Sequence, residues 1–160
     1  MEPTWIVLAD EGRARILELR QPGRDLEEVE ELTDPAAHAR NADFRHDAYG
    51  RRAPGDSQGG GAPGNQTMAA TATSSAGEEK LDHEAELFAR RVSERLTQAH
   101  RQHRYAELHI AAAPRFLGRL RKVLDREVSD AVVEELDKDL LQLDRRTLTQ
   151  RLFPTQQRGG

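Results

Sequence analysis

The stretch EEKLDHEAELFARRVSERLTQAHRQH, residues 78–103, predicts one long amphipathic helix around which the rest of the chain is organised. Its apolar residues recur at steps of three and four and form one stripe, as in a helix that packs on a core. They are Leu81, Ala85, Phe88, Val92, Leu96 and Ala99. Ser75, followed three residues later by Glu78, predicts a capping box at the start. At about 1.5 Å per residue this helix would be roughly 39 Å long, and it needs a sheet to pack on.

The sequence on either side of this helix predicts the sheet. Before it, short apolar runs separated by turn residues indicate a meander of three strands. The segments after it indicate a strand, a helix, a strand preceded by a helical turn, and a closing helix. The strands are expected at 5–9, 14–19, 26–32, 107–113 and within 130–137, and the helices at 115–124 and 140–152. This order predicts an α/β fold, a mixed sheet covered by helices.

The segment 26–32 is the least decided of these elements. Leu26, Val29 and Leu32 alternate only weakly among glutamates, which favours a solvent-facing edge strand. A helix fits the same spacing of three, so both interpretations stay open.

Length and composition bound the class of protein. We expect residues 1–160 to form a single domain, because 160 residues is an ordinary domain size. The formal charge of −4 argues against binding of bulk polyanions, although a local basic patch is compatible with it. The chain has no cysteine for disulfides or thiolate chemistry, and no stretch approaches the ~18 apolar residues of a membrane span. Without a basic leader before Trp5, we expect a cytoplasmic protein with no membrane partner and no cofactor.

Residues 36–77 predict a long glycine-rich loop, because seven of the twelve glycines lie between Gly50 and Gly77. A segment of this length without a periodic pattern is either functional or a low-complexity insertion. In the functional interpretation, arginines meet phosphates and glycines let the backbone approach a partner closely. The candidate binding residues are Arg45, Arg51, Arg52, Gln58, Gly59, Gly60 and Gly61.

A second candidate interface is the basic surface of the long helix and the helix at 115–124. Its principal candidates are Arg91, Arg95 and Arg115, and it also includes Arg90, Arg119, Arg121 and Lys122. Clustered cations bind RNA or an acidic partner, but a solvated helix face has the same composition. The sequence leaves both interpretations open.

Asp10, at the end of the first predicted strand, opens a catalytic alternative. A strand-end carboxylate followed by Gly12 resembles the hairpin of ribonuclease-H-like enzymes, in which such carboxylates bind two divalent metals. Asp137 and Asp139 are available as further ligands, yet an Asp-Glu-Gly triplet is more often simply a turn. We therefore expect no metal site and no catalytic residue, and keep a metal-dependent nuclease or hydrolase using Asp10 as an alternative.

The histidines do not predict a metal site either. His100 and His103 lack a third ligand and are expected to face solvent near the end of the long helix. His109 is expected to be a hydrogen-bonded strand residue. We find no nucleophile elbow of the Gly-x-Ser-x-Gly kind.

Several short motifs resemble those of the bacterial host attachment protein family. They are Trp5-Ile6-Val7-Leu8-Ala9-Asp10, Gly12-Arg13-Ala14-Arg15, Asp47 with Gly50-Arg51, Phe88-Ala89, Pro114-Arg115-Phe116-Leu117-Gly118, Leu120-Arg121 and Lys138-Asp139-Leu140. The resemblance runs from about Trp5 to Leu152, and the Pro-Arg-Phe-Leu-Gly segment is its most specific part. It implies one host-attachment-type domain, in a family named for a proposed role in attaching bacteria to host cells.

The order of the parts is also similar to the middle domain of archaeo-eukaryotic peptide-chain release factors, where a strand meander, a long loop and a long helix follow one another. In those factors the loop carries Gly-Gly-Gln, which positions water on the peptidyl-tRNA ester. Here the loop has Gln58-Gly59-Gly60-Gly61 and Gly64-Asn65-Gln66, so the hydrolytic role does not carry over. The resemblance implies a ribosome, tRNA or another RNA as partner, with a homodimer left open.

These observations together predict a cytoplasmic, non-enzymatic factor that binds the translation machinery or RNA through its glycine-rich loop. The alternative is an attachment factor that acts at the cell surface, as the family name implies, although we find no export signal in the sequence.

Overall fold

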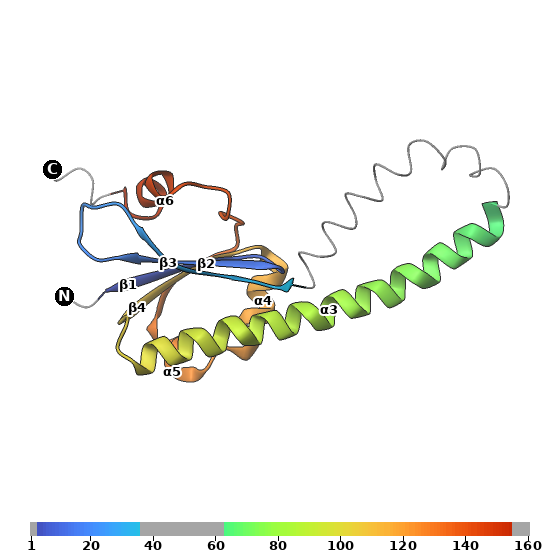
Figure 1. Ribbon diagram of the computed structural model, residues 1–160, viewed down its shortest axis with the longest axis horizontal. Helices are drawn as coiled ribbons and strands as arrows, with labels where there is room; N and C mark the ends of the chain where they lie inside the picture. Colours follow the sequence, from blue (N-terminus) through green and yellow to red (C-terminus); the bar gives the residue numbers. More distant parts are fainter. Residues whose placement is uncertain (1–2, 36–62, 155–160) are drawn as a thin grey trace.

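The computed structural model describes residues 3–35 and 63–154, with the backbone alone described at 63–76. Its strands are β1 (Thr4–Ala9), β2 (Arg13–Leu19), β3 (Glu27–Thr33), β4 (Glu107–Ala112) and β5 (Val132–Leu136). Its helices are α3 (Pro63–Arg101), α4 (Pro114–Val123), α5 (Arg126–Ala131) and α6 (Arg145–Leu152). Figure 1 shows α3, α4 and α5 on one side of the sheet and α6 on the other.

The five strands form one mixed sheet in the order β3-β2-β1-β4-β5. β2 pairs antiparallel with both β1 and β3, so the predicted meander is confirmed. β4 pairs parallel with both β1 and β5. A parallel pair needs a crossover connection. Between β1 and β4 the chain passes through β2 and β3 and then through α3. The predicted α/β class with a mixed sheet and covering helices is therefore confirmed.

The alternation of side chains along the strands divides the core into two clusters. Val7 of β1 faces α3 and α4, where the rings of Phe88 and Phe116 pack with centroids 5.8 Å apart. Leu8 points to the opposite face and packs in the cluster that contains Leu148 of α6. The sheet is thus covered by apolar contacts on both faces.

The long helix begins earlier than the sequence predicted. α3 starts at Pro63 rather than Glu78, so the expected loop is wrong for residues 63–77 and the expected cap at Ser75 is wrong as well. Proline suits the first position of a helix because its missing N–H would be unpaired there. Of the residues that follow, the alanines favour a helix, whereas the glycines, threonines and serines do not. At about 1.5 Å per residue, the 39 residues of α3 span roughly 58 Å.

The other end of α3 is set by a local motif, which stops the helix at Arg101 rather than at His103. His103 has a φ of 57°, in the left-handed region. The N–H of Arg104 donates to the Ala99 carbonyl at 3.0 Å, and the N–H of His103 donates to the His100 carbonyl at 3.0 Å. This is the Schellman arrangement, which terminates a helix and here directs the chain into β4.

The closing helix is shorter than predicted. α6 begins at Arg145, not at Leu140, because Asp144 caps it: the Asp144 carboxylate accepts the N–H of Thr147 at 2.7 Å. The leucines before this cap were read as part of the helix stripe. Leu140 and Leu141 instead lie buried against the sheet in the segment that leads to α6.

Candidate functional site

Most of the predicted binding residues lie outside the described residues: Arg45, Arg51, Arg52, Gln58, Gly59, Gly60 and Gly61. The structure does place the end of α3 that follows them in sequence. Pro63 lies at the end of α3 that projects beyond the sheet (Figure 1).

The projecting part of α3 is exposed where its side chains are described. Residues 78–83 are all exposed, and full burial begins at Ala85. Leu81, predicted to lie on the buried stripe, is 41% exposed, because α3 has already left the sheet at that point. The apolar stripe therefore continues about one turn beyond the core.

Two of the predicted basic residues contact β3 instead of forming an open surface. The Nη1 atom of Arg91 donates to the carbonyl of Thr33 at 3.1 Å. The Nε atom of Arg95 lies 2.5 Å from Oε1 of Glu30, and both side chains of this pair are mostly buried. These contacts tie α3 to β3, which lies at the edge of the sheet as predicted.

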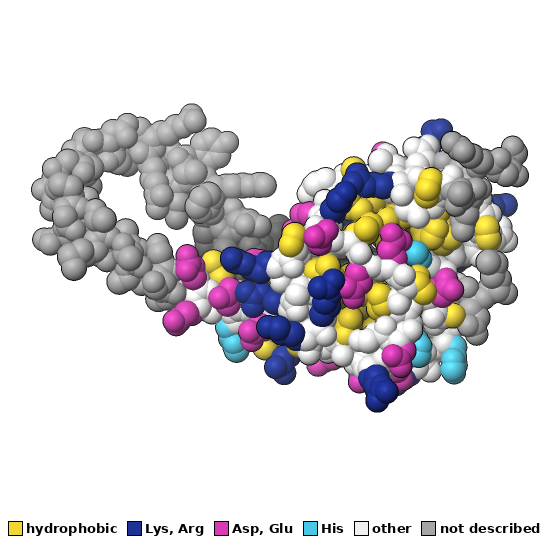
Figure 2. Space-filling view, turned by 180° about the vertical axis from the view of Figure 1, so that it is seen from behind, with side chains coloured by type: hydrophobic (Ala, Val, Ile, Leu, Met, Phe, Trp, Pro, Cys, Tyr) yellow, Lys and Arg dark blue, Asp and Glu magenta, His cyan; other side chains and the backbone are white. Residues whose placement is uncertain are grey.

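The cations of α4 differ among themselves. Nη2 of Arg119 lies 2.7 Å from Oδ1 of Asp82 on α3, and Nη2 of Arg121 lies 2.5 Å from Oε2 of Glu135 on β5. Arg115 is exposed and forms no ion pair with the described residues. Figure 2 shows basic side chains gathered where the long helix meets the body, with acidic ones interleaved. Of the three principal candidates for the predicted basic surface, Arg91 and Arg95 thus contact β3, and Arg115 is exposed on α4.

Asp10 has a structural role in the turn between β1 and β2. Its Oδ1 accepts the N–H of Gly12 at 2.9 Å and the N–H of Arg13 at 2.8 Å. Asp139, a suggested second ligand, accepts the N–H of Leu141 at 3.1 Å. Within residues 3–35 and 63–154, no group of three or more side chains of metal-binding type is placed to hold an ion.

Two of the histidines, His109 and His100, pack against aromatic rings. Nδ1 of His109 lies 3.0 Å from Oε2 of Glu134, and its ring meets that of Phe153 edge-on at 5.1 Å, so His109 is a partnered strand residue as predicted. His100, predicted to face solvent, is only partly exposed because its ring packs at 5.4 Å from that of Tyr105.

Structural contacts shift the pKa of Tyr105 and that of Asp144, and a hydrogen bond to Glu18 raises the pKa of Arg20. Burial raises the pKa of Tyr105, whose hydroxyl donates to the Leu96 carbonyl at 2.7 Å. The N–H of Thr147 holds the pKa of the Asp144 carboxyl below its ordinary value. Tyr105 anchors the end of α3 and Asp144 caps α6, so neither of these two shifts points to catalysis.

A groove of about 650 Å³ runs between the C-terminal half of α3 and the α4–α5 connection. Several of its polar groups already have partners. The hydroxyl of Ser93 donates to the Val123 carbonyl at 2.9 Å, and Nε of Arg101 lies 2.8 Å from Oε1 of Glu127. These contacts hold α4 and α5 against α3, and we assign the groove no ligand.

Sequence reasoning missed the arginines of α6. Arg145, Arg146 and Arg151 are exposed, and none forms an ion pair with the described residues. A signal was available: the eight residues RRTLTQRL contain three arginines and no acidic residue.

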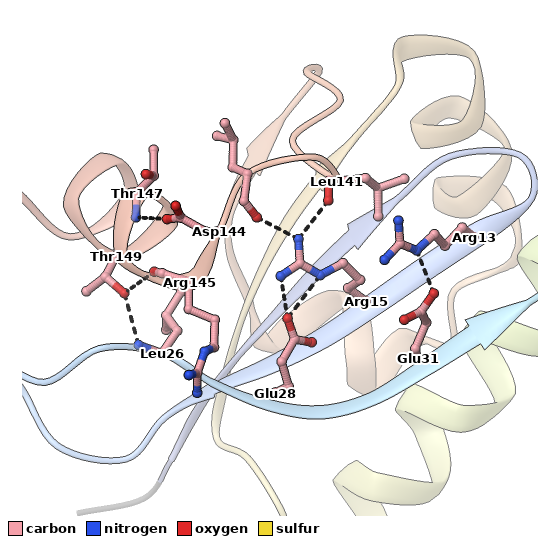
Figure 3. Close-up of polar contacts among 11 residues, drawn as sticks. Arg13, Arg15, Leu26, Glu28, Glu31, Leu141, Asp144, Arg145, Thr147 and Thr149 are labelled. Atoms are coloured by element: carbon pink, nitrogen blue, oxygen red, sulfur yellow. Dashed lines mark hydrogen bonds and ion pairs between the residues drawn. The ribbon is translucent and has the colours of Figure 1, made fainter.

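The sheet holds α6 and the segment before it through buried polar contacts (Figure 3). The guanidinium of Arg15, on β2, donates to the carbonyls of Leu141 and Leu143 at 2.7 and 2.8 Å and pairs with Glu28. Only 8% of the Arg15 side chain is exposed. The hydroxyl of Thr149 in α6 accepts a backbone N–H from the segment before β3 at 2.9 Å. These bonds fix the position of α6 on the sheet.

In the part of the chain that the structure describes, no helix combines the length and the apolar character needed to cross a membrane.

Comparison with known proteins adds a family and a fold. A family model described as "Protein required for attachment to host cells" matches residues 5–152. No match was found among curated proteins. Among solved structures, the crystal structure of an archaeal translation termination factor, aRF1, is similar with a TM-score of 0.52 at 12% sequence identity. That match covers 98% of this chain and 36% of that one, so this chain corresponds to one part of the larger factor. Both resemblances expected from the sequence are confirmed, the second at the level of the fold.

Proposed function

The chain belongs to the family of proteins described as required for attachment to host cells, and from this premise we propose that it is a non-enzymatic binding factor of the cytoplasm whose partner is the translation machinery or RNA. The fold shared with a translation termination factor supports this choice of partner. The lack of a Gly-Gly-Gln tripeptide in the sequence supports binding without hydrolysis.

The observation that carries the proposal is the projecting end of α3. Helices in proteins are stabilised mainly by packing of one face, yet the first part of α3 projects beyond the sheet (Figure 1). A partner that packs against this part of α3 would supply packing contacts that the sheet does not provide there. Arg45, Arg51 and Arg52 lie in the segment that precedes α3 in sequence, and arginines bind phosphates well.

Sedimentation of tagged protein from growing cells through a density gradient tests the proposal. We expect the protein to migrate with ribosomal particles and to shift toward the top after ribonuclease treatment. Replacing Arg45, Arg51 and Arg52 by glutamate should release it from the particles. A control with Arg126→Glu and Lys138→Glu, two exposed cations elsewhere, should leave migration unchanged. Migration only at the top of the gradient, in growing and in starved cells alike, would overturn the proposal.

The second candidate is an attachment factor that acts at the cell surface, and the family description favours it. Protease treatment of intact cells separates the two. Digestion of the tagged protein while a cytoplasmic control stays intact would support the surface role, whereas protection until the cells are lysed would support the cytoplasmic one.

A further inference from the structure

We propose that α6 forms a contact for the phosphate backbone of RNA through Arg145, Arg146 and Arg151, on the face of the sheet opposite α3. This inference rests on the proposed function. It adds a second surface that none of the sequence motifs indicated.

The α3–α4 layer contains both paired and unpaired arginines, Arg115 being unpaired, whereas every arginine of α6 is unpaired among the described residues. On the α3–α4 side, Arg95, Arg119 and Arg121 each have a carboxylate partner within 2.5–2.7 Å. The three arginines of α6 have no such partner among the described residues. Guanidinium groups without a carboxylate keep their charge and their fork of donors available for phosphate oxygens.

Helix stability does not explain where these arginines stand. Arg145 and Arg146 occupy the first turn of α6, where the helix macrodipole disfavours cations, and no acidic residue shares that turn. The carboxylate of Asp144, just before them, accepts the N–H of Thr147 and attracts Arg146 electrostatically, but it forms no close ion pair with either arginine. Two cations in this position are better explained by an external anion than by the fold.

The setting of α6 favours RNA over a lipid surface. A helix that binds a membrane interface buries large apolar side chains in it. On α6 the exposed residues besides the arginines are Thr147 and Gln150, which are polar. Side chains of this kind join arginine in contacts to phosphate and sugar oxygens of nucleic acids.

The attachment of α6 to the sheet fixes the backbone from which the three arginine side chains project. Leu148 is fully buried, Thr149 is hydrogen-bonded to the segment before β3, and Arg15 fixes the segment that leads into α6. A partner therefore meets a helix that needs no ordering on binding, which lowers the entropic cost of association.

Binding of a labelled single-stranded RNA to the purified full chain tests the inference, with wild type compared with the triple variant Arg145→Glu, Arg146→Glu, Arg151→Glu. We expect the variant to lose about tenfold or more in affinity. The slope of log K against log salt should fall by about 2 for three lost phosphate contacts. The matched control Arg104→Glu, Arg126→Glu, Lys138→Glu changes the charge equally at exposed sites outside the candidate interfaces and should bind within about twofold of wild type.

Other results of the RNA-binding experiment would contradict the inference or change the partner it names. Equal losses in the α6 variant and the control, or no loss in either, would overturn the inference and leave the proposed function standing. Absence of any RNA binding by wild type would overturn the inference, while the gradient experiment decides the proposed function, and binding to vesicles of anionic lipid alone would replace RNA by a membrane. If the glutamate substitutions disturb folding, variants with glutamine or lysine at positions 145, 146 and 151 replace them. The triple glutamine variant should bind RNA weakly, and the triple lysine variant should recover most of the affinity. A triple glutamine variant that binds RNA as tightly as wild type would contradict the inference.

Discussion

The two helical layers on either side of the sheet use the same residue type in opposite ways. On the α3–α4 side, several arginines are structural: Arg95 joins α3 to β3, and Arg119 joins α4 to α3, although Arg115 is exposed and unpaired among the described residues. On the α6 side the structural arginine comes from the sheet, since Arg15 holds the segment before α6, and the helix's own arginines face solvent. Counting cations on a helix therefore does not locate a binding surface, because cations already paired with carboxylates are the least available to a partner.

The largest effect should come from the apolar contact beneath α3. Phe88→Ala removes a fully buried ring that packs against Phe116, and we expect the free energy of unfolding to fall by about 3–5 kcal/mol. Leu87→Ala, at a neighbouring position that is 49% exposed, should cost less than about 0.5 kcal/mol. Urea denaturation of both variants checks this. Equal losses would mean that the buried face of α3 is assigned wrongly.

The attachment of α6 should give the next largest effect. Arg15→Met leaves the buried carbonyl of Leu141 without its donor, and we expect a loss of about 2–3 kcal/mol in urea denaturation. The loss is limited because the Glu28 side chain is partly exposed, so water can hydrogen-bond to its carboxylate once the Arg15 guanidinium is removed. The control Arg13→Met breaks a more exposed pair with Glu31 and should cost less than about 1 kcal/mol. Similar losses in both would show that Arg15 does not hold α6.

A smaller effect tests the contrast between paired and unpaired arginines directly. Arg95→Gln should lower the free energy of unfolding by about 1 kcal/mol, because it removes a mostly buried ion pair to Glu30. Arg151→Gln should change it by less than about 0.5 kcal/mol, since the Arg151 side chain has no partner among the described residues. Thermal unfolding of the two single variants measures both changes in stability. A loss for Arg151→Gln as large as that for Arg95→Gln would remove the distinction between the layers.

The smallest effect should appear only at high pH. Burial raises the pKa of Tyr105 above its ordinary 10.0, so the unfolded chain releases this proton at a lower pH than the folded one. Stability contributed by the neutral phenol is present below pH 10 and should decline as the pH rises above it. Denaturation of wild type and Tyr105→Phe at a series of pH values checks this. The stability difference between them should shrink above pH 10, and a constant difference would contradict the assignment.

The sequence predicted the parts of the fold that depend on apolar periodicity. The stripe through Phe88 and Leu96 identified the packed half of α3, and the alternating runs identified the sheet. The first part of α3 was missed because its sequence carries no apolar stripe, and its glycines and serines are also typical of loops. The closing helix was predicted too long because Leu140 and Leu141 continue its spacing, although they pack before the cap.

The candidate site was harder to predict, because it depends on partners that are distant in sequence. Nothing near Arg91 or Arg95 in the sequence shows that Thr33 and Glu30 accept their hydrogen bonds. The basic face was therefore predicted from composition alone, and the structure divides it. The arginines of α6 were visible as a run without acidic neighbours, but only the structure shows them unpaired on a helix fixed to the sheet.

Site-specific photocrosslinking in growing cells tests most directly the central claim that the projecting end of α3 and the outer surface of α6 meet RNA. A photoreactive residue would replace Lys80 on α3, Arg146 on α6 or Val133 on β5 in turn, all three at exposed positions. We expect RNA adducts from positions 80 and 146 and none above background from position 133. Adducts from position 133 alone, or from none of the three in cells that contain the folded protein, would contradict it.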